Sequence, residues 1–441
     1  MKLDWKKTFL IGFGFFGISV VWQVYNTFVP LFLQSGDPLF DAQSKSDILG
    51  FGLSATWSGF IMTLDNIAAL ILLPLVGAWS DRTRTRIGRR YPFILTGAPI
   101  AALAFALVPV ATGMINPAAN GKIVGNGGPF ALFIAAIGVF LLAMACFRTP
   151  VVAMMPDLTP SPLRSKANGV INFMGGFGGV IAALGLASFF DLNQGIPFWA
   201  GVIIMLVAVV VMFVTVREPK MEDLPVEQAG GQKQRLGLRN IALAPAENRK
   251  SLILLMLAIF CWFVGYGGIG SFLSSYAVTN LGVSAGTAGM LSSISTGAFI
   301  LFAIPAGIIG GRFGRKRTII SGLIVFAILL LFARAVPTLA AMYVALGLGG
   351  LAWSLVNVNS LPMIVDTTND ARLLGTFTGL YYFASQSADI LGPILNGAVI
   401  DLTGRNYSNI LVVAPIFFVL AILCMLRVTR GEATHAAEGA N

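Results

Sequence analysis

Long apolar stretches, separated by short arginine-rich turns, recur along the whole chain. Residues 168–190 contain no charged side chain, and neither do residues 252–281. A helix that crosses a bilayer needs about 20 mostly apolar residues, because each residue rises about 1.5 Å through a hydrocarbon core about 30 Å thick. A water-soluble domain could not bury so many segments of this length at once. The stretches therefore predict a membrane protein with many spanning helices.

The composition supports the same class of protein. Hydrophobic residues make up 56% of the 441 residues, charged residues make up 11%, and the mean hydropathy is +0.82. A soluble globular domain carries about 25% charged residues. The stretches are apolar on every side and do not alternate between apolar and polar, which favours helices over the strands of a membrane β-barrel. We expect an all-α polytopic membrane protein.

Hydropathy windows place about twelve transmembrane helices along the chain. The predicted spans are residues 8–33, 54–79, 91–112, 129–154, 165–190, 196–216, 251–278, 287–310, 317–334, 338–364, 373–399 and 407–427. A polar stretch in the middle of the chain separates them into two equal groups. We predict an N-terminal six-helix bundle at residues 1–216, a cytoplasmic linker at 217–250, a C-terminal six-helix bundle at 251–430 and a cytoplasmic tail at 431–441.

Basic residues concentrate in alternate loops, and cytoplasmic loops are the ones enriched in lysine and arginine. With the N-terminus inside, the clusters at residues 82–90 and 312–317 fall on the cytoplasmic side. This arrangement predicts a multi-pass protein of the cell inner membrane with both termini cytoplasmic. Topology and contact with membrane lipid explain the net charge of +10, and its dispersal among turns argues against nucleic-acid binding.

The residues needed for enzymatic or metal chemistry are missing from the pattern. The three cysteines, Cys146, Cys261 and Cys424, all fall within predicted spans, and the single histidine, His435, lies in the polar tail. No serine–histidine or cysteine–histidine pair suited to catalysis is expected, nor a zinc site or a disulfide framework. We expect no enzyme, no metal and no cofactor apart from a coupling ion.

The two halves echo each other in sequence. In the first half a turn runs from Gly77 to Arg90, and a turn from Gly307 to Lys316 takes the same place in the second half. A second echo joins the fourth and fifth helices of each half. It pairs Asp157 and Arg164 with Asp366 and Arg372. Such echoes are typical of a parallel repeat about an axis along the membrane normal.

The turn that contains Gly77, Asp81, Arg82, Gly88, Arg89 and Arg90 resembles the signature loop of the major facilitator superfamily. Its longer form, followed by Tyr91, Pro92 and Phe93, is similar to the branch of sucrose transporters and glycoside-pentoside-hexuronide cation symporters. The resemblance implies the major facilitator fold, with helices 1, 4, 7 and 10 lining a central cavity and a sugar moved together with a cation. Leu73 stands where melibiose-type symporters carry a carboxylate, which disfavours a sodium or lithium site of that kind.

Three ionisable side chains, Asp65, Arg148 and Asp389, lie deep inside predicted spans. Each costs about 2.5–3.5 kcal/mol at a helix centre, so each is a functional candidate. A low-dielectric site favours the neutral form of a carboxylic acid, and Asp65 and Asp389 are therefore predicted proton carriers. Arg148 offers a planar fork of donors, and the resemblance to sucrose transporters implies contact with substrate. The alternatives are fixed polar contacts for the carboxylates and snorkelling to the inner interface for Arg148.

Further substrate-binding candidates are amides and hydroxyls near the middle of spans, because a sugar needs polar partners in an apolar cleft. They are Gln23, Asn26, Asn172, Tyr266, Asn357, Asn359, Tyr382 and Gln386. Trp22, Trp262 and Trp353 are candidates for stacking on a sugar, although an aromatic side chain in a span more often packs against lipid or the core.

Aspartates at cytoplasmic helix ends can pair with arginines of the adjacent turns. Exposed ion pairs are worth about 0–1 kcal/mol each, so they form and break easily, as a gate requires. The predicted cytoplasmic gate consists of Asp81, Arg82, Gly88, Arg89, Arg90, Asp157, Arg164, Asp366 and Arg372. The alternative is that the arginines only anchor the loops on the cytoplasmic side.

These features predict a two-lobed helical carrier with buried carboxylates, and the resemblance implies a secondary active transporter that takes up a sugar or glycoside, such as a disaccharide, by proton symport and alternating access. We expect it to act as a monomer in the lipid bilayer, with a small molecule as its substrate. Proton-driven efflux of an amphipathic compound is the alternative. A membrane sensor that has lost transport is less favoured, since nothing in residues 431–441 resembles a signalling domain.

Overall fold

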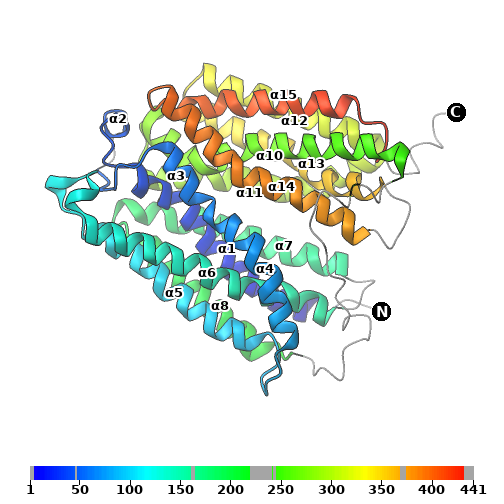
Figure 1. Cartoon of the computed structure of the whole chain (residues 1–441), viewed down its shortest axis with the longest axis horizontal. Coiled ribbons are helices and arrows are strands. Elements are labelled where there is room, and N and C mark those ends of the chain that lie inside the picture. Colours follow the sequence, from blue (N-terminus) through cyan, green and yellow to red (C-terminus); the bar gives the residue numbers. More distant parts are fainter. Residues whose placement is uncertain are drawn as a thin grey trace. The chain divides into compact units, whose positions relative to one another are not determined.

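Helices form the regular structure of the part of the chain that the computed structural model describes, residues 4–44, 47–159, 164–218, 241, 245–367 and 374–431 (Figure 1). The helices of the first half are α1 (Trp5–Gln34), α2 (Pro38–Asp41), α3 (Ala55–Met62), α4 (Leu64–Arg82), α5 (Tyr91–Gly113), α6 (Gly127–Leu158), α7 (Arg164–Ile181) and α8 (Ile196–Thr215). Those of the second half are α10 (Ala246–Asn280), α11 (Ala285–Phe313), α12 (Arg315–Ala335), α13 (Leu339–Val365), α14 (Leu374–Leu402) and α15 (Ile410–Leu426). Short turns of other helix types join several of them.

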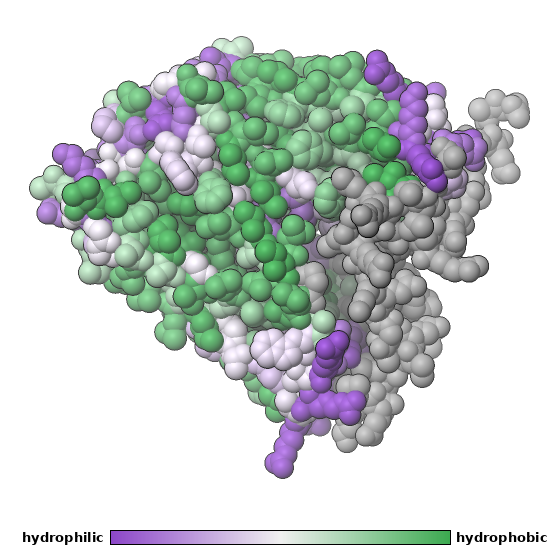
Figure 2. Space-filling model, in the orientation of Figure 1, coloured by the Kyte–Doolittle hydropathy of each residue, from purple (hydrophilic) through white to green (hydrophobic). Residues whose placement is uncertain are grey.

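Among the described residues, 11 helical segments are long and apolar enough to cross a membrane, which confirms the predicted all-α polytopic class. The 29-residue helix α14 is not among them. Its polar side chains, which include Gln386, Asp389 and Asn396, lower its hydropathy. The predicted total of twelve spans thus depends on α14. Figure 2 shows hydrophobic side chains over much of the visible face of the helices, as contact with hydrocarbon requires.

The contacts between residues divide the chain into two compact units. Unit 1 comprises Met1–Ser54, Leu64–Gly231 and Ala277–Ser293, and unit 2 comprises Ala55–Thr63, Gln232–Tyr276 and Ile294–Asn441. Within unit 1, α1 packs on α7 and α8, while α4 and α5 pack on α6. Within unit 2, α12 packs on α13 and α15, and α3 packs on α14.

The second predicted span is broken at Thr63. The Thr63 N–H donates to the carbonyls of Gly59 and Phe60, each at 3.1 Å, and its hydroxyl donates to the Phe60 carbonyl at 2.8 Å. A threonine hydroxyl that bonds to the preceding turn often bends a helix. The chain ends α3 here and begins α4 one residue later, so Asp65 occupies the first turn of a helix and not the middle of one.

Small residues let α3 and α14 approach closely inside unit 2. A Cβ atom added to Gly59 would lie 2.5 Å from the Pro393 carbonyl oxygen, and one added to Gly397 would lie 2.5 Å from the carbonyl oxygen of Ala55. Backbone therefore meets backbone at both glycines, which is how helices pack when no larger side chain intervenes.

Candidate functional site

Asp65 and Arg148 come together inside unit 1. Asp65 lies in the first turn of α4, Arg148 lies on α6, and the two helices pack against each other. Their side chains interact electrostatically. The backbone N–H of Asn66 stabilises the Asp65 carboxylate, but the Oδ1 atom is buried and has no hydrogen-bond partner among the described residues. The structure therefore brings together two predicted site residues and leaves one carboxylate oxygen available.

Helix α1 supplies two buried donors to the same unit. Neither the hydroxyl of Tyr25 nor the indole N–H of Trp22 has a hydrogen-bond partner in the part of the chain that the structure describes. Tyr25 also interacts electrostatically with Asp65, which places the hydroxyl near the carboxylate. The two rings meet edge to face, with centroids 5.4 Å apart. A buried polar group without a partner costs about 1–3 kcal/mol, so these two donors are available to a polar ligand or to water.

A second cluster lies inside unit 2. The rings of Tyr266 on α10 and Trp353 on α13 stack face to face, with centroids 4.0 Å apart and an interplanar angle of 1°. The Tyr266 hydroxyl forms a hydrogen bond with Ser295. Phe263 packs edge-on against Trp353 at 5.6 Å. Most of the exposed edge of this stack belongs to Tyr266, which is half-buried, whereas Trp353 is only 4% exposed.

Asp389 on α14 borders this aromatic cluster. Its Oδ2 atom accepts a hydrogen bond from the Gln386 amide at 3.2 Å, and it interacts electrostatically with Tyr266 and Tyr381. The Ser360 hydroxyl lies 3.3 Å from the hydroxyl of Tyr381. The sequence analysis selected Tyr382 and not Tyr381, because both tyrosines lie at the same depth of the predicted span and the sequence does not show which of them is buried. The structure shows that Tyr381 is buried and that Tyr382 is 49% exposed.

The remaining predicted substrate residues differ in their surroundings. The Gln23 amide donates to the Thr27 hydroxyl at 3.2 Å on the same helix. Asn26 and Asn172 are exposed, and Asn357 is half-buried. The Asn359 side chain, by contrast, is 3% exposed and donates to the carbonyls of Ala306 and Leu355 at 3.1 and 2.9 Å. Its donors are thus taken up in tying α13 to α11.

An ion-pair network lies at the end of unit 1 that carries the Gly77–Arg90 turn. Asp157 accepts from the Arg89 guanidinium at 2.8 Å and from that of Arg90 at 3.0 Å. Arg90 also lies 2.5 Å from Asp81. Gly88 precedes the two arginines with a φ of +108°, a left-handed conformation that favours glycine. Arg82 is exposed and forms no ion pair with any described residue.

Glu218, which was not among the predicted site residues, completes this network. Its carboxylate accepts from the Arg90 N–H at 3.1 and 2.9 Å and lies 3.8 Å from the Arg89 guanidinium. Burial raises the pKa of Glu218, although the surrounding N–H groups and the Arg90 charge oppose this shift. Glu218 stands at the start of the polar stretch that was predicted to be a linker. Its contacts with Arg89 and Arg90 could be found only from the folded structure.

Unit 2 repeats part of this arrangement. Asp366, which ends α13, forms an ion pair with Arg315 at the start of α12. Gly314 has a φ of +91° and takes the place that Gly88 holds in unit 1. Arg372 lies outside the described residues, as does the side chain of Arg164.

Two further aspartates cap helices within the units. The two oxygens of Asp401 accept from the N–H groups of Ala55 and Thr56, each at 2.9 Å, at the start of α3. Asp191 accepts from the Gly286 N–H at 3.0 Å and the Ser284 hydroxyl at 2.6 Å at the start of α11. Both aspartates precede a leucine at the end of the fifth helix of their half, an echo that the sequence analysis missed.

The family model described as MFS/sugar transport protein matches residues 10–430. An uncharacterized symporter of Synechocystis sp. is 24% identical over 282 residues, which cover 64% of this chain and 48% of that protein. A sucrose transport protein of Arabidopsis thaliana is 29% identical over 131 residues, or 27% of this chain and 21% of the other. The matched part is thus less than half of the length of either relative.

Solved structures share the fold at low identity. The nucleoside transporter NupG aligns with a TM-score of 0.67 and 16% identity, covering 96% of this chain and 99% of that one. A peptide transporter of the POT family aligns with a TM-score of 0.66 and 14% identity, covering 96% of both chains. These likenesses confirm the predicted transporter fold.

Proposed function

Since the chain belongs to the MFS/sugar transport protein family, we propose that it imports a sugar or glycoside, such as a disaccharide, together with protons by alternating access. Family membership makes it a multi-pass membrane transporter of a small molecule and not an enzyme. We place it in the cell inner membrane as a monomer, with both termini cytoplasmic and with the proton as its coupling ion. Proton symport is the finer part of the proposal and rests on the geometry of unit 1.

The Asp65–Arg148 pair beside unpartnered donors of α1 is the observation that carries the proposal. An arginine stays protonated in proteins, so the charge of this pair is set by Asp65 alone. When Asp65 is ionised, it holds the guanidinium of Arg148 by charge. When Asp65 takes up a proton, that attraction is lost and the donors of Arg148 become available to sugar hydroxyls. Protonation and sugar binding then favour each other, as symport requires.

Unit 2 offers the complementary chemistry. A sugar ring presents apolar C–H faces as well as hydroxyls, so its recognition needs both aromatic surface and hydrogen-bond partners. The Tyr266–Trp353 stack provides the aromatic surface, and the neighbouring Gln386–Asp389 pair provides a polar edge. Asp389 is kept as a second candidate for proton coupling.

The cytoplasmic gate is proposed to act through the Asp157–Arg89–Arg90 network and the Asp366–Arg315 pair. Both join the end of the fourth helix of a half to the turn between its second and third helices. The side chains of Arg89, Arg90 and Asp157 are buried, so they are not the exposed, easily broken pairs expected from the sequence, and the network can open only if water solvates the separated charges.

A binding screen tests the sugar assignment. Purified full-length protein is screened against mono- and disaccharides by thermal shift at pH 5.5 and pH 8. We expect one group of sugars to raise the melting temperature, more strongly at the lower pH. Arg148→Ala abolishes the shift, whereas Arg82→Ala, which removes an exposed arginine from the same unit, retains it. If no sugar binds while hydrophobic cations do, the efflux alternative replaces this proposal.

A further inference from the structure

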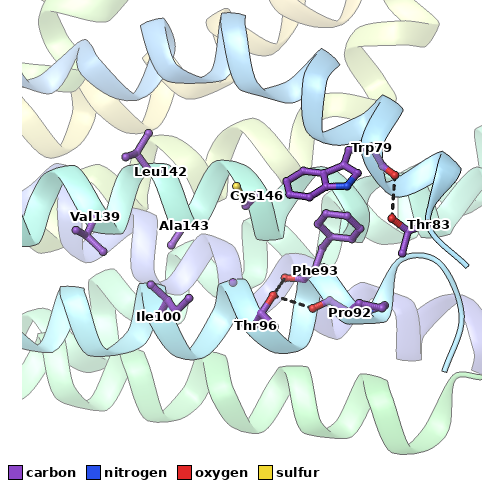
Figure 3. A pocket seen from close by; sticks show the side chains of 11 residues that line it. Trp79, Thr83, Pro92, Phe93, Thr96, Ile100, Val139, Leu142, Ala143 and Cys146 are labelled. Carbon is purple, nitrogen blue, oxygen red and sulfur yellow. Dashed lines mark hydrogen bonds between the residues drawn. The ribbon is translucent and has the colours of Figure 1, made fainter. Parts of the chain in front are cut away.

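A hollow of about 560 Å³ lies on the surface of unit 1 between α4, α5 and α6. Figure 3 shows the rings of Trp79 and Phe93 at one end of it, close to Thr83, and Ile100, Val139 and Leu142 toward the other end. The floor is formed by small residues. A Cβ atom on Gly97 would lie 2.9 Å from the Cβ atom of Phe147, so α5 and α6 pack closely there and leave the space above them open.

The walls of the hollow are apolar and exposed. Trp79 is 66% exposed, Ile100 is 49% exposed and Leu142 is 53% exposed. The hydroxyls at the rim are already occupied, because Thr83 donates to the Trp79 carbonyl at 3.0 Å and Thr96 donates to the Pro92 carbonyl at 2.8 Å. The interior therefore suits a hydrocarbon chain better than a sugar.

In the topology proposed above, the hollow runs from the cytoplasmic helix ends toward the middle of the bilayer. From Phe93 to Ile100, seven residues along α5, it extends about 10 Å at about 1.5 Å per residue. Trp79 lies near the end of α4, where aromatic side chains of membrane proteins collect at the level of the lipid headgroups. The Trp79 indole N–H donates to no described residue, so it can reach a headgroup or ester oxygen.

Positive charge gathers at the mouth. Arg82 ends α4, Arg84 and Arg86 follow it, and Thr83 between the first two lines the hollow. All three arginines are exposed and form no ion pair with any residue that the structure describes. Figure 2 shows hydrophilic side chains projecting where this turn leaves α4, at the bottom of the view.

The nearby aspartates, Asp81 and Asp157, pair with Arg89 and Arg90 and not with these three arginines. Arg89 and Arg90, in the same turn, are 8% and 4% exposed and are paired with Asp157. Asp81 lies at the end of α4 but pairs with Arg90 at 2.5 Å. The turn thus contains two buried arginines that are paired with Asp157 and three exposed arginines without an ion pair to any described residue.

We propose that this hollow is a binding site for an anionic phospholipid of the cytoplasmic leaflet, with an acyl chain between α4, α5 and α6 and the headgroup phosphate held by Arg84, Arg86 and the Trp79 indole. Clustered arginines at a cytoplasmic helix end attract anionic lipids, and an apolar hollow beneath them retains a chain. The site is independent of the transported substrate.

Tryptophan quenching by brominated lipids tests the site. The full-length protein is reconstituted with chain-brominated phosphatidylglycerol or chain-brominated phosphatidylcholine at low ionic strength. Since the chain has seven tryptophans, the Trp79 signal is taken as the difference between the wild type and Trp79→Phe. We expect phosphatidylglycerol to quench this signal at a concentration at least about ten-fold lower than phosphatidylcholine does.

Matched charge variants identify the headgroup contact. Arg84→Gln/Arg86→Gln is expected to abolish the preference for phosphatidylglycerol. Arg312→Gln/Arg317→Gln, which removes the same charge from the corresponding turn of the second half, is expected to retain it. Equal quenching by the two lipids in the wild type, or a preference that survives Arg84→Gln/Arg86→Gln, overturns the proposal. Cross-links between Cys146 of two copies, without any lipid preference, would make the hollow a protein interface and would also overturn it.

Discussion

At the scale of single residues, two asparagines on α13 that looked alike in the sequence differ in the structure. Asn359 is buried and hydrogen-bonded to backbone carbonyls, whereas Asn357 is half-buried. Asn359→Ala leaves the carbonyls of Ala306 and Leu355 without that donor, and we expect it to cost about 1–3 kcal/mol of unfolding free energy. The melting temperature should fall, while sugar affinity of the folded protein changes little. Asn357→Ala serves as the matched control, because its half-buried side chain is expected to affect affinity more than stability. A lower melting temperature for Asn357→Ala than for Asn359→Ala would contradict this assignment.

Glu218 gives a pH-dependent prediction at the same scale. Burial raises its pKa, so the native protein binds this proton more tightly than the unfolded chain does. The contribution of Glu218 to stability is therefore present below the ordinary pKa of about 4.3 and is lost as the pH rises through the folded-state pKa. Glu218→Gln removes this titration and keeps an acceptor for the Arg90 N–H. The variant should gain in melting temperature relative to the wild type as the pH rises from about 4 to about 7; parallel curves would rule this out.

Residue identity alone could place the charged members of the candidate site that lie inside spans, but neither its neutral member Tyr25 nor Glu218 outside the spans. Asp65, Arg148 and Asp389 were predictable because a charge in an apolar span is costly and therefore rare. Tyr25 was not, since its only distinguishing property is an unpaired buried hydroxyl, which depends on what packs around it. Glu218 was missed for the same reason: its carboxylate matters because the fold buries it against Arg89 and Arg90.

At the scale of helices, the cap that Asp401 gives to α3 makes a separate prediction. A capping side chain is worth about 0.5–2 kcal/mol, so Asp401→Ala should loosen α3 from α14. We expect a cysteine placed at Ser58, a fully buried α3 position, to react with a maleimide about ten-fold faster in that variant. Asp401→Asn, which keeps one acceptor oxygen, should fall in between. An unchanged labelling rate in Asp401→Ala would show that the cap does not hold the helix.

Helix boundaries were predictable where composition changes sharply and unpredictable where a helix breaks inside an apolar stretch. The predicted spans at residues 317–334 and 338–364 agree closely with α12 and α13, because Pro337 and its polar neighbours separate them. The break at Thr63 was not predictable from hydropathy, since its neighbours Met62 and Leu64 are apolar and the two polar residues that follow, Asp65 and Asn66, do not end the apolar stretch. Only the hydrogen bonds of Thr63 reveal it.

At the scale of the whole molecule, the sequence repeat predicts two six-helix halves, whereas contacts assign Ala55–Thr63 to unit 2 and Ala277–Ser293 to unit 1. At the helix ends that Asp401 and Asp191 cap, the unit to which a segment belongs by its contacts is thus not the half to which it belongs by its place in the sequence. A pattern in one dimension reports which residues follow one another, but which helix a given end packs against depends on the folded state. The family and its transporter fold could nevertheless be predicted from the Gly77–Arg90 turn and its repeat.

Proton-driven sugar accumulation in proteoliposomes tests the central claim most directly. Labelled sugar is followed with an imposed pH gradient, acid outside, for the wild type, Asp65→Asn, Asp389→Asn and the double variant, and exchange of sugar without a gradient serves as the control for folding and binding. The proposed coupling predicts that the wild type concentrates the sugar and that Asp65→Asn exchanges it without concentrating it. Accumulation by Asp65→Asn and by the double variant Asp65→Asn/Asp389→Asn equal to that of the wild type would contradict the account.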